Sequence, residues 1–125
     1  MDVLTADALP SGRQPPTAAL LAVVAVGGAL GSLARYGLVL AAPNLAMTLA
    51  VNVVGSFLLG ALVALRPQGR WSRPFLGSGV LGGFTTFSAF AVQTLDASLP
   101  TGIAYVAISL GLGLGAARLG LQVRR

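Results

Sequence analysis

Residues 75–95 read FLGSGVLGGFTTFSAFAVQTL, a run of 21 residues without a charged side chain. A hydrocarbon core about 30 Å thick takes roughly 20 helical residues to cross, so this run is long enough to span a membrane. Three further apolar stretches of comparable length lie at about residues 17–40, 45–65 and 101–117. All seven prolines fall outside the four stretches, where helices are expected to begin or end. The sequence therefore predicts an all-α membrane protein with four transmembrane helices.

The composition also indicates a chain surrounded by a lipid bilayer. Hydrophobic residues make up 55% of the chain and charged residues 9%, where a soluble domain carries roughly 25% charge. All eight basic residues are arginines, and the chain contains neither histidine nor cysteine. It therefore lacks the residues of a zinc site, a thiolate nucleophile and the usual general base, and we expect it not to be an enzyme. The arginines lie between the apolar stretches, so no nucleic-acid partner is expected.

The chain is predicted to form one compact domain without a soluble lobe. We expect a disordered N-terminal tail over residues 1–16, a four-helix transmembrane domain over residues 17–119 and a short basic C-terminal tail over residues 120–125. With four helices, both termini lie on one side of the membrane. That side carries seven arginines, and the opposite loops carry only Asp96. The positive-inside rule then predicts cytoplasmic termini. The seven are Arg13, Arg66, Arg70, Arg73, Arg118, Arg124 and Arg125.

Glycines spaced four residues apart suggest where the helices pack. Because lipid tails are as apolar as the side chains, membrane helices associate through close approach of their backbones. Such pairs occur at Gly27 and Gly31 and again at Gly111 and Gly115. We expect both pairs to lie at helix contacts.

Polar residues recur on one face of the second span. Thr48, Asn52 and Ser56 are four residues apart, so they form a polar stripe along the helix. The stripe supplies either hydrogen bonds between helices or donors that line a pore. Tyr105 and Ser109 repeat the spacing in the fourth span, and the same two interpretations apply.

The middle of the third span is unfavourable for a continuous helix. Gly82 and Gly83 are followed by two β-branched threonines, and each glycine costs roughly 1 kcal/mol relative to alanine. We therefore expect this helix to be broken at mid-membrane. Carbonyls freed near Gly82 and Thr85 could hold a monovalent cation. The alternative is a simple kink at a packing contact.

Two phenylalanines follow the expected break. Phe87 and Phe90 are three residues apart, which places them near one face of the helix. Because the edge of a phenyl ring is electropositive, edges turned toward a pore could stabilise a small anion, with Ser88 and Asn52 as nearby donors. Packing of both rings in the protein core is the alternative.

Three blocks of the sequence resemble the signature blocks of the Fluc (CrcB) fluoride-channel family. They are GGALGSLARY at residues 27–36, TLAVNVVGSFLLG at 48–60 and GVLGGFTTFSAF at 79–90. The order and spacing are similar to those of the family, and the resemblance covers about residues 17–118. It implies a dimer of two antiparallel subunits, with two fluoride pores along the interface and one central structural sodium ion that is not transported.

The resemblance also implies roles for single residues. Gly82 and Thr85 would supply backbone carbonyls to the sodium ion. The fluoride pathway would contain Phe87 and Phe90 as aromatic ligands, Asn52 as a donor and Ser88 in a polar track. Arg35 would face a vestibule. Ala89 stands where the family usually has Thr, so the polar track has one hydroxyl fewer.

The function implied by the resemblance is passive export of fluoride from the cytoplasm through a bacterial plasma membrane, which lowers fluoride toxicity. A small proton-coupled drug exporter would need a carboxylate within the membrane, and the four spans contain none. A membrane subunit without transport activity is the second alternative. The arginine bias favours insertion in one orientation. The inverted partner is either a second copy of this chain or, on the hypothesis of insertion in one orientation, an oppositely oriented homologue.

Overall fold

The computed structural model describes residues 16–124, all of them in helices or the short connections between helices. The elements are α1 (Thr17–Ala41), α2 (Leu45–Leu65), η1 (Pro74–Leu81), α3 (Gly82–Phe84), α4 (Phe87–Asp96) and α5 (Leu99–Leu121). Taken together, η1, α3 and α4 form a third span, Pro74–Asp96. The third span, α1, α2 and α5 are the four helices of this region that are long and apolar enough to cross a membrane. The predicted all-α architecture with four spans is confirmed.

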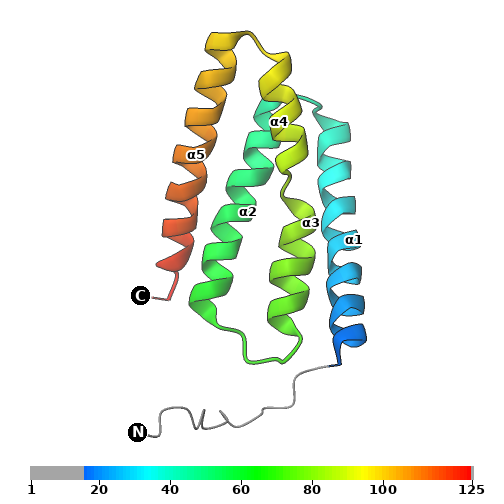
Figure 1. The fold of residues 1–125 in the computed structure, drawn as a ribbon. Helices are drawn as coiled ribbons and strands as arrows, with labels where there is room; N and C mark the ends of the chain where they lie inside the picture. Colours follow the sequence, from blue (N-terminus) through cyan, green and yellow to red (C-terminus); the bar gives the residue numbers. More distant parts are fainter. Residues whose placement is uncertain (1–15, 125) are drawn as a thin grey trace, which may run out of the picture.

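The four spans run up and down beside one another, so that α1 begins and α5 ends at the same end of the bundle (Figure 1). The most extensive contacts join α2 to α5 and α1 to η1 and α3. Outward-facing apolar side chains are strongly exposed, among them Leu21 (64%) and Leu114 (68%). This exposure is expected where lipid tails rather than water surround the helices.

Glycines bring the paired helices into backbone contact. Gly27 and Gly31 are buried, and a Cβ atom at Gly27 would lie 2.6 Å from the Phe75 carbonyl oxygen. The prediction for this pair is confirmed. Gly111 and Gly115 are exposed and have no atom within 4 Å of an added Cβ, so the expected packing role is wrong within this chain.

The contact between α2 and α5 uses a different pair of glycines. Gly60 faces the Ala117 carbonyl oxygen, and Gly120 faces that of Phe57. The spacing of glycines along α5 shows that close contacts are available, but it does not say which face of the helix meets a neighbour.

The third span bends between α3 and α4 (Figure 1). Thr85 (φ −77°, ψ 157°) and Thr86 (φ −144°, ψ 123°) have extended backbones. Gly82 remains helical, with φ −62° and ψ −39°, so the bend lies three residues beyond the first glycine of the pair. The expected mid-membrane break stays a prediction.

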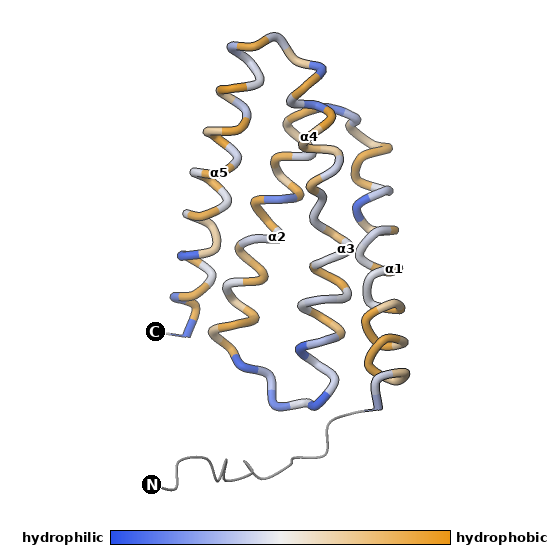
Figure 2. The backbone as a smooth tube through the Cα atoms, in the orientation of Figure 1, coloured by the Kyte–Doolittle hydropathy of each residue, from blue (hydrophilic) through white to orange (hydrophobic). Residues whose placement is uncertain are grey.

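Hydrophilic residues lie in the connections at both ends of the bundle, and a few lie within α1 and α2 (Figure 2). Arg66 ends α2 in a left-handed conformation with φ 46°, and the Arg70 guanidinium lies 5.0 Å from the centre of the Trp71 ring. Arg118 lies in the last turn of α5, at the same end of the bundle.

The predicted tails are only partly within the described residues. Residues 1–15 and Arg125 lie outside them, and with them most of the predicted N-terminal tail. α5 continues through Leu121 into a turn that reaches Arg124. The boundaries drawn for the tails stay predictions.

Candidate functional site

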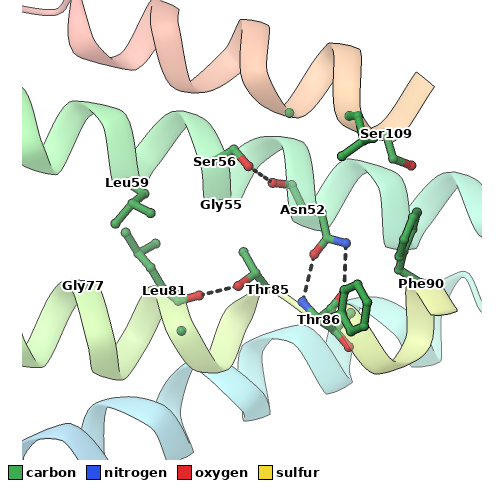
Figure 3. Close-up of a pocket in the computed structure, with 14 residues that line it drawn as sticks. Asn52, Gly55, Ser56, Leu59, Gly77, Leu81, Thr85, Thr86, Phe90 and Ser109 are labelled. Carbon is green, nitrogen blue, oxygen red and sulfur yellow. Dashed lines mark hydrogen bonds between the residues drawn. The ribbon is translucent and has the colours of Figure 1, made fainter. Parts of the chain in front are cut away.

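A cleft of about 400 Å³ lies between α2, the third span and α5 (Figure 3). We call it the central cleft. Seven of the residues selected from the sequence line it: Asn52, Ser56, Gly82, Thr85, Phe87, Phe90 and Ser109. Thr48, Ser88, Arg35 and Tyr105 do not line it. The fold therefore brings together residues from three separate stretches of the chain.

Asn52 on α2 holds the backbone of the bend (Figure 3). Its Nδ2 donates to the Thr86 carbonyl oxygen at 3.0 Å, and its Oδ1 accepts from the Thr86 N–H at 2.8 Å. Thr86 is 8% exposed. The N–H and carbonyl of an extended residue within a helix lack helical partners. Leaving such groups unpaired in lipid costs roughly several kcal/mol. The Asn52 amide satisfies both groups.

Thr86 also caps α4. Its Oγ1 accepts from the Ala89 N–H at 3.2 Å and lies 3.3 Å from the Ser88 Oγ. An extended threonine whose hydroxyl bonds the third residue of the next helix is a standard N-cap. This interaction fixes where α4 begins, at Phe87. Thr86 was not among the residues selected from the sequence, although a threonine before an apolar helical run is a recognisable cap signal.

The Thr85 hydroxyl and N–H both bond within their own helical turn. Its Oγ1 donates to the Leu81 carbonyl oxygen at 3.0 Å, within the same helical turn, and its methyl group lies against Gly55 on α2. Among the described residues, none donates a hydrogen bond to the Thr85 carbonyl oxygen. Gly82 is exposed and lines the central cleft with Thr85.

These groups fit the expected sodium site in their chemistry. Backbone carbonyl oxygens are ligands suited to a hard cation, and the Thr85 carbonyl is free to act as one. The described residues contain no group of three or more acidic, histidine or cysteine side chains that could hold a metal.

The aromatic side chains form a chain of ring contacts. The Phe87 and Phe90 centroids are 5.9 Å apart with their planes at 44°, and Phe90 lies 5.2 Å from the Tyr105 ring at 40°. Phe87 is 79% exposed, whereas Tyr105 is 6% exposed. The Tyr105 hydroxyl donates to the Gln93 Oε1 at 3.2 Å and so links α5 to α4. Gln93 was not selected from the sequence.

The remaining polar residues have different surroundings. The Ser56 Oγ donates to the Asn52 carbonyl oxygen at 2.8 Å, within α2. Thr48 is buried, at 2% exposed. Two buried atoms, the Arg35 Nε and the Ser109 Oγ, have no hydrogen-bond partner in the described part of the chain. The polar stripe on α2 thus makes contacts within its own helix as well as between helices.

Comparison with known proteins places this arrangement in a family. The model of the family described as CrcB-like protein, Camphor Resistance (CrcB), matches residues 22–121. The chain belongs to the CrcB family. The match includes all the residues that line the central cleft and most of the four spans.

Other CrcB relatives are similar over most of their length. The protein named fluoride-specific ion channel FluC 1 of Rhodococcus jostii is 52% identical over 101 residues, 81% of this chain and 82% of the relative. The fluoride-specific ion channel FluC of Paracoccus denitrificans is 45% identical over 113 residues, 82% of this chain and 91% of the relative. The fluoride-specific ion channel FluC of Deinococcus radiodurans is 46% identical over 112 residues, which are 78% of this chain and 88% of the relative. These are names of ion channels, and the expectation that the chain is not an enzyme is confirmed.

Proposed function

We propose that this CrcB protein is a fluoride channel that conducts fluoride passively out of the cytoplasm of a bacterium and so lowers fluoride toxicity. The names of its relatives support fluoride as the ion. The observation that carries the proposal is the central cleft, where a pair of phenyl rings lies beside amide and hydroxyl groups and no acidic side chain is present.

The direction of export follows from the membrane potential. Neutral hydrogen fluoride enters a cell from acidic surroundings and ionises at the neutral pH inside. A negative-inside voltage then drives the trapped anion outward, with roughly 2.3 kcal/mol per charge at 100 mV. Passive flow needs no coupled proton, in agreement with the four described spans, whose only Asp, Glu or His residue is Asp96 at the end of the third span.

In this proposal, the rings and the donors bind the anion. The positive edges of Phe87 and Phe90 face the fluoride path, and the exposure of Phe87 leaves its ring available. Asn52 retains one Nδ2 hydrogen beyond its bond to Thr86. Ser88 adds a hydroxyl at the start of α4.

The structural sodium ion is part of the same proposal. Gly82 and Thr85 would bind it through their carbonyl oxygens, and the bend would act as a helix break that exposes these groups. When bound, the ion would supply a fixed positive charge at the subunit interface. It would not be transported.

We propose an antiparallel dimer in the plasma membrane, with the termini of this chain in the cytoplasm. Arg66, Arg70, Arg73, Arg118 and Arg124 lie at one end of the described bundle. Asp96 lies at the other end. This asymmetry favours a single orientation for this chain. Its inverted partner is then an oppositely oriented homologue rather than a second copy.

The experiment is fluoride efflux from liposomes that contain the purified chain alone, with a potassium ionophore to balance charge. Selective efflux over chloride, lost in Phe87→Ile, would support a self-sufficient channel. If the chain is silent alone but conducts when co-expressed with an inverted homologue, the heterodimer is supported. Absence of flux in both preparations would contradict the channel and favour a subunit without transport activity.

A further inference from the structure

We propose that Asn52 is a positioning residue whose side-chain amide acts as a clamp on the bend, and that the channel depends on both of its hydrogen bonds to Thr86. The inference rests on the proposed fluoride conduction. It assigns Asn52 a task beyond that of an anion ligand, because its side-chain amide makes two hydrogen bonds to the backbone of Thr86.

The clamp has two parts, both on α2. The Asn52 amide pairs with the N–H and the carbonyl of Thr86 across 34 positions of sequence. One turn along, Gly55 has no side chain, and the methyl group of Thr85 occupies that space. Together they seat the two extended residues against α2. Thr86 is almost completely buried, so water is not available to replace the amide.

The clamp controls the aromatic pair through the start of α4. Thr86 caps this helix, Phe87 is its first residue, and Phe90 lies one turn later. A shift of the Thr86 backbone would therefore move both rings. It would also reorient the free carbonyl of Thr85, the residue before Thr86.

The clamp requires a side chain that donates and accepts at the same time. An ionised Asp at position 52 would accept from the Thr86 N–H but would place a second acceptor against the Thr86 carbonyl. A protonated Asp offers one donor and one acceptor, as Asn does. Asn52→Asp should therefore conduct only when its carboxyl is protonated.

The chain offers a matched control in its other asparagine. Asn44 caps α2, and its Oδ1 accepts from the Met47 N–H at 2.9 Å. No donated bond from its side chain is present among the described residues, and Asp is as good a cap as Asn. Asn44→Asp introduces the same carboxyl without disturbing the clamp.

Other charged or titratable groups are present on elements that pack against α2. They are Arg35 and Tyr36 on α1, Asp96 on α4, and Tyr105 and Arg118 on α5. None of them lines the central cleft with Asn52. The native chain, measured over the same pH range, accounts for any response of these groups.

The first test is fluoride efflux between about pH 5 and about pH 8, with empty liposomes to subtract leakage of hydrogen fluoride. Above the carboxyl pKa, efflux through Asn52→Asp should rise about tenfold for each unit by which the pH falls, relative to the native chain. Asn44→Asp should follow the native profile. Recovery in the same liposomes shows that the variant is folded. A flat profile for Asn52→Asp would overturn the proposal.

The second test separates positioning from direct binding of the anion. In Asn52→Leu, efflux should be lost and hydrogen exchange of the Thr86 amide should accelerate at least about tenfold, because its acceptor is gone. Loss of efflux with unchanged exchange at Thr86 would show that Asn52 acts only on fluoride and would overturn the clamp. If the native chain conducts neither alone nor with an inverted homologue, the proposed function fails, whereas exchange at Thr86 still reports whether the clamp exists.

Discussion

The two halves of the third span are held by different kinds of contact. Along η1, the contact with α1 is backbone against backbone, with Gly27 and Gly31 facing carbonyl groups of the third span. At the bend, the contact with α2 is made by the Asn52 amide and the backbone of Thr86. The first contact tolerates no added atoms, and the second requires a particular set of donors and acceptors. Added bulk should therefore disrupt the contact with α1, and a change in hydrogen-bonding groups should disrupt the contact with α2.

The largest expected effect comes from adding bulk at Gly31. A Cβ there would meet the Val80 carbonyl oxygen and lie 2.8 Å from the Phe84 nitrogen, so Gly31→Leu cannot be accommodated without separating α1 from the third span. Overpacking by even a methylene group costs about 1–3 kcal/mol. We expect no folded protein by size-exclusion chromatography. The control is Gly37→Leu on the same helix, where an added Cβ would have no atom within 4 Å. Equal yields of the two variants would contradict the close contact at Gly31.

The next largest effect is expected from Phe87→Ile, which should abolish fluoride conduction while the protein stays folded. Phe87 is largely exposed, so Phe87→Ile should leave the thermal unfolding temperature nearly unchanged while fluoride efflux falls to the leak of empty liposomes. Isoleucine fills similar space but has no electropositive ring edge. The control is Leu95→Ile, at a position on the same helix that is 84% exposed and outside the central cleft. Normal efflux through Phe87→Ile would remove the ring from the fluoride pathway.

A smaller effect is expected from removal of the cap at the bend. Thr86→Ala deletes the hydroxyl that bonds the Ala89 N–H, and loss of an N-cap costs about 1 kcal/mol. Because such a cost changes a population about fivefold, we expect efflux to fall by up to about fivefold. Thr86→Ser keeps the hydroxyl and should retain most of the activity. Equal losses in the two variants would show that the cap does not position α4.

The smallest effect should come from Tyr105→Phe. This change keeps the ring beside Phe90 and removes only the hydrogen bond to Gln93, a net contribution of about 0.5–1.5 kcal/mol. We expect unfolding to shift to lower temperature by a few degrees, with a modest fall in efflux. Gln93→Leu should reproduce the shift. If the two changes are additive in the double variant, the hydroxyl and the amide do not act as a pair.

Much of the fold could be predicted because hydropathy and proline placement are local signals. They gave the four spans, and the spacing of Gly27 and Gly31 located one true helix contact. The same spacing failed at Gly111 and Gly115, because it carries no information about which face meets a neighbour.

The candidate site was predictable in its members but not in its interactions. Asn52 and Phe87 were selected as polar and aromatic residues within apolar stretches, and both line the central cleft. The bond between Asn52 and Thr86 depends on where the third span bends, which long-range packing decides. Gln93 was missed for the same reason, because its partner lies on another helix, whereas the cap made by Thr86 is a local signal that the sequence does carry.

The most direct test of the account is the current carried by the purified channel, with its inverted partner where one is required, across a planar bilayer with unequal fluoride concentrations. We predict a current whose reversal potential follows the fluoride gradient and does not change when chloride or proton gradients are imposed. A reversal potential that follows chloride or protons, or no current in either preparation, would contradict a passive fluoride channel.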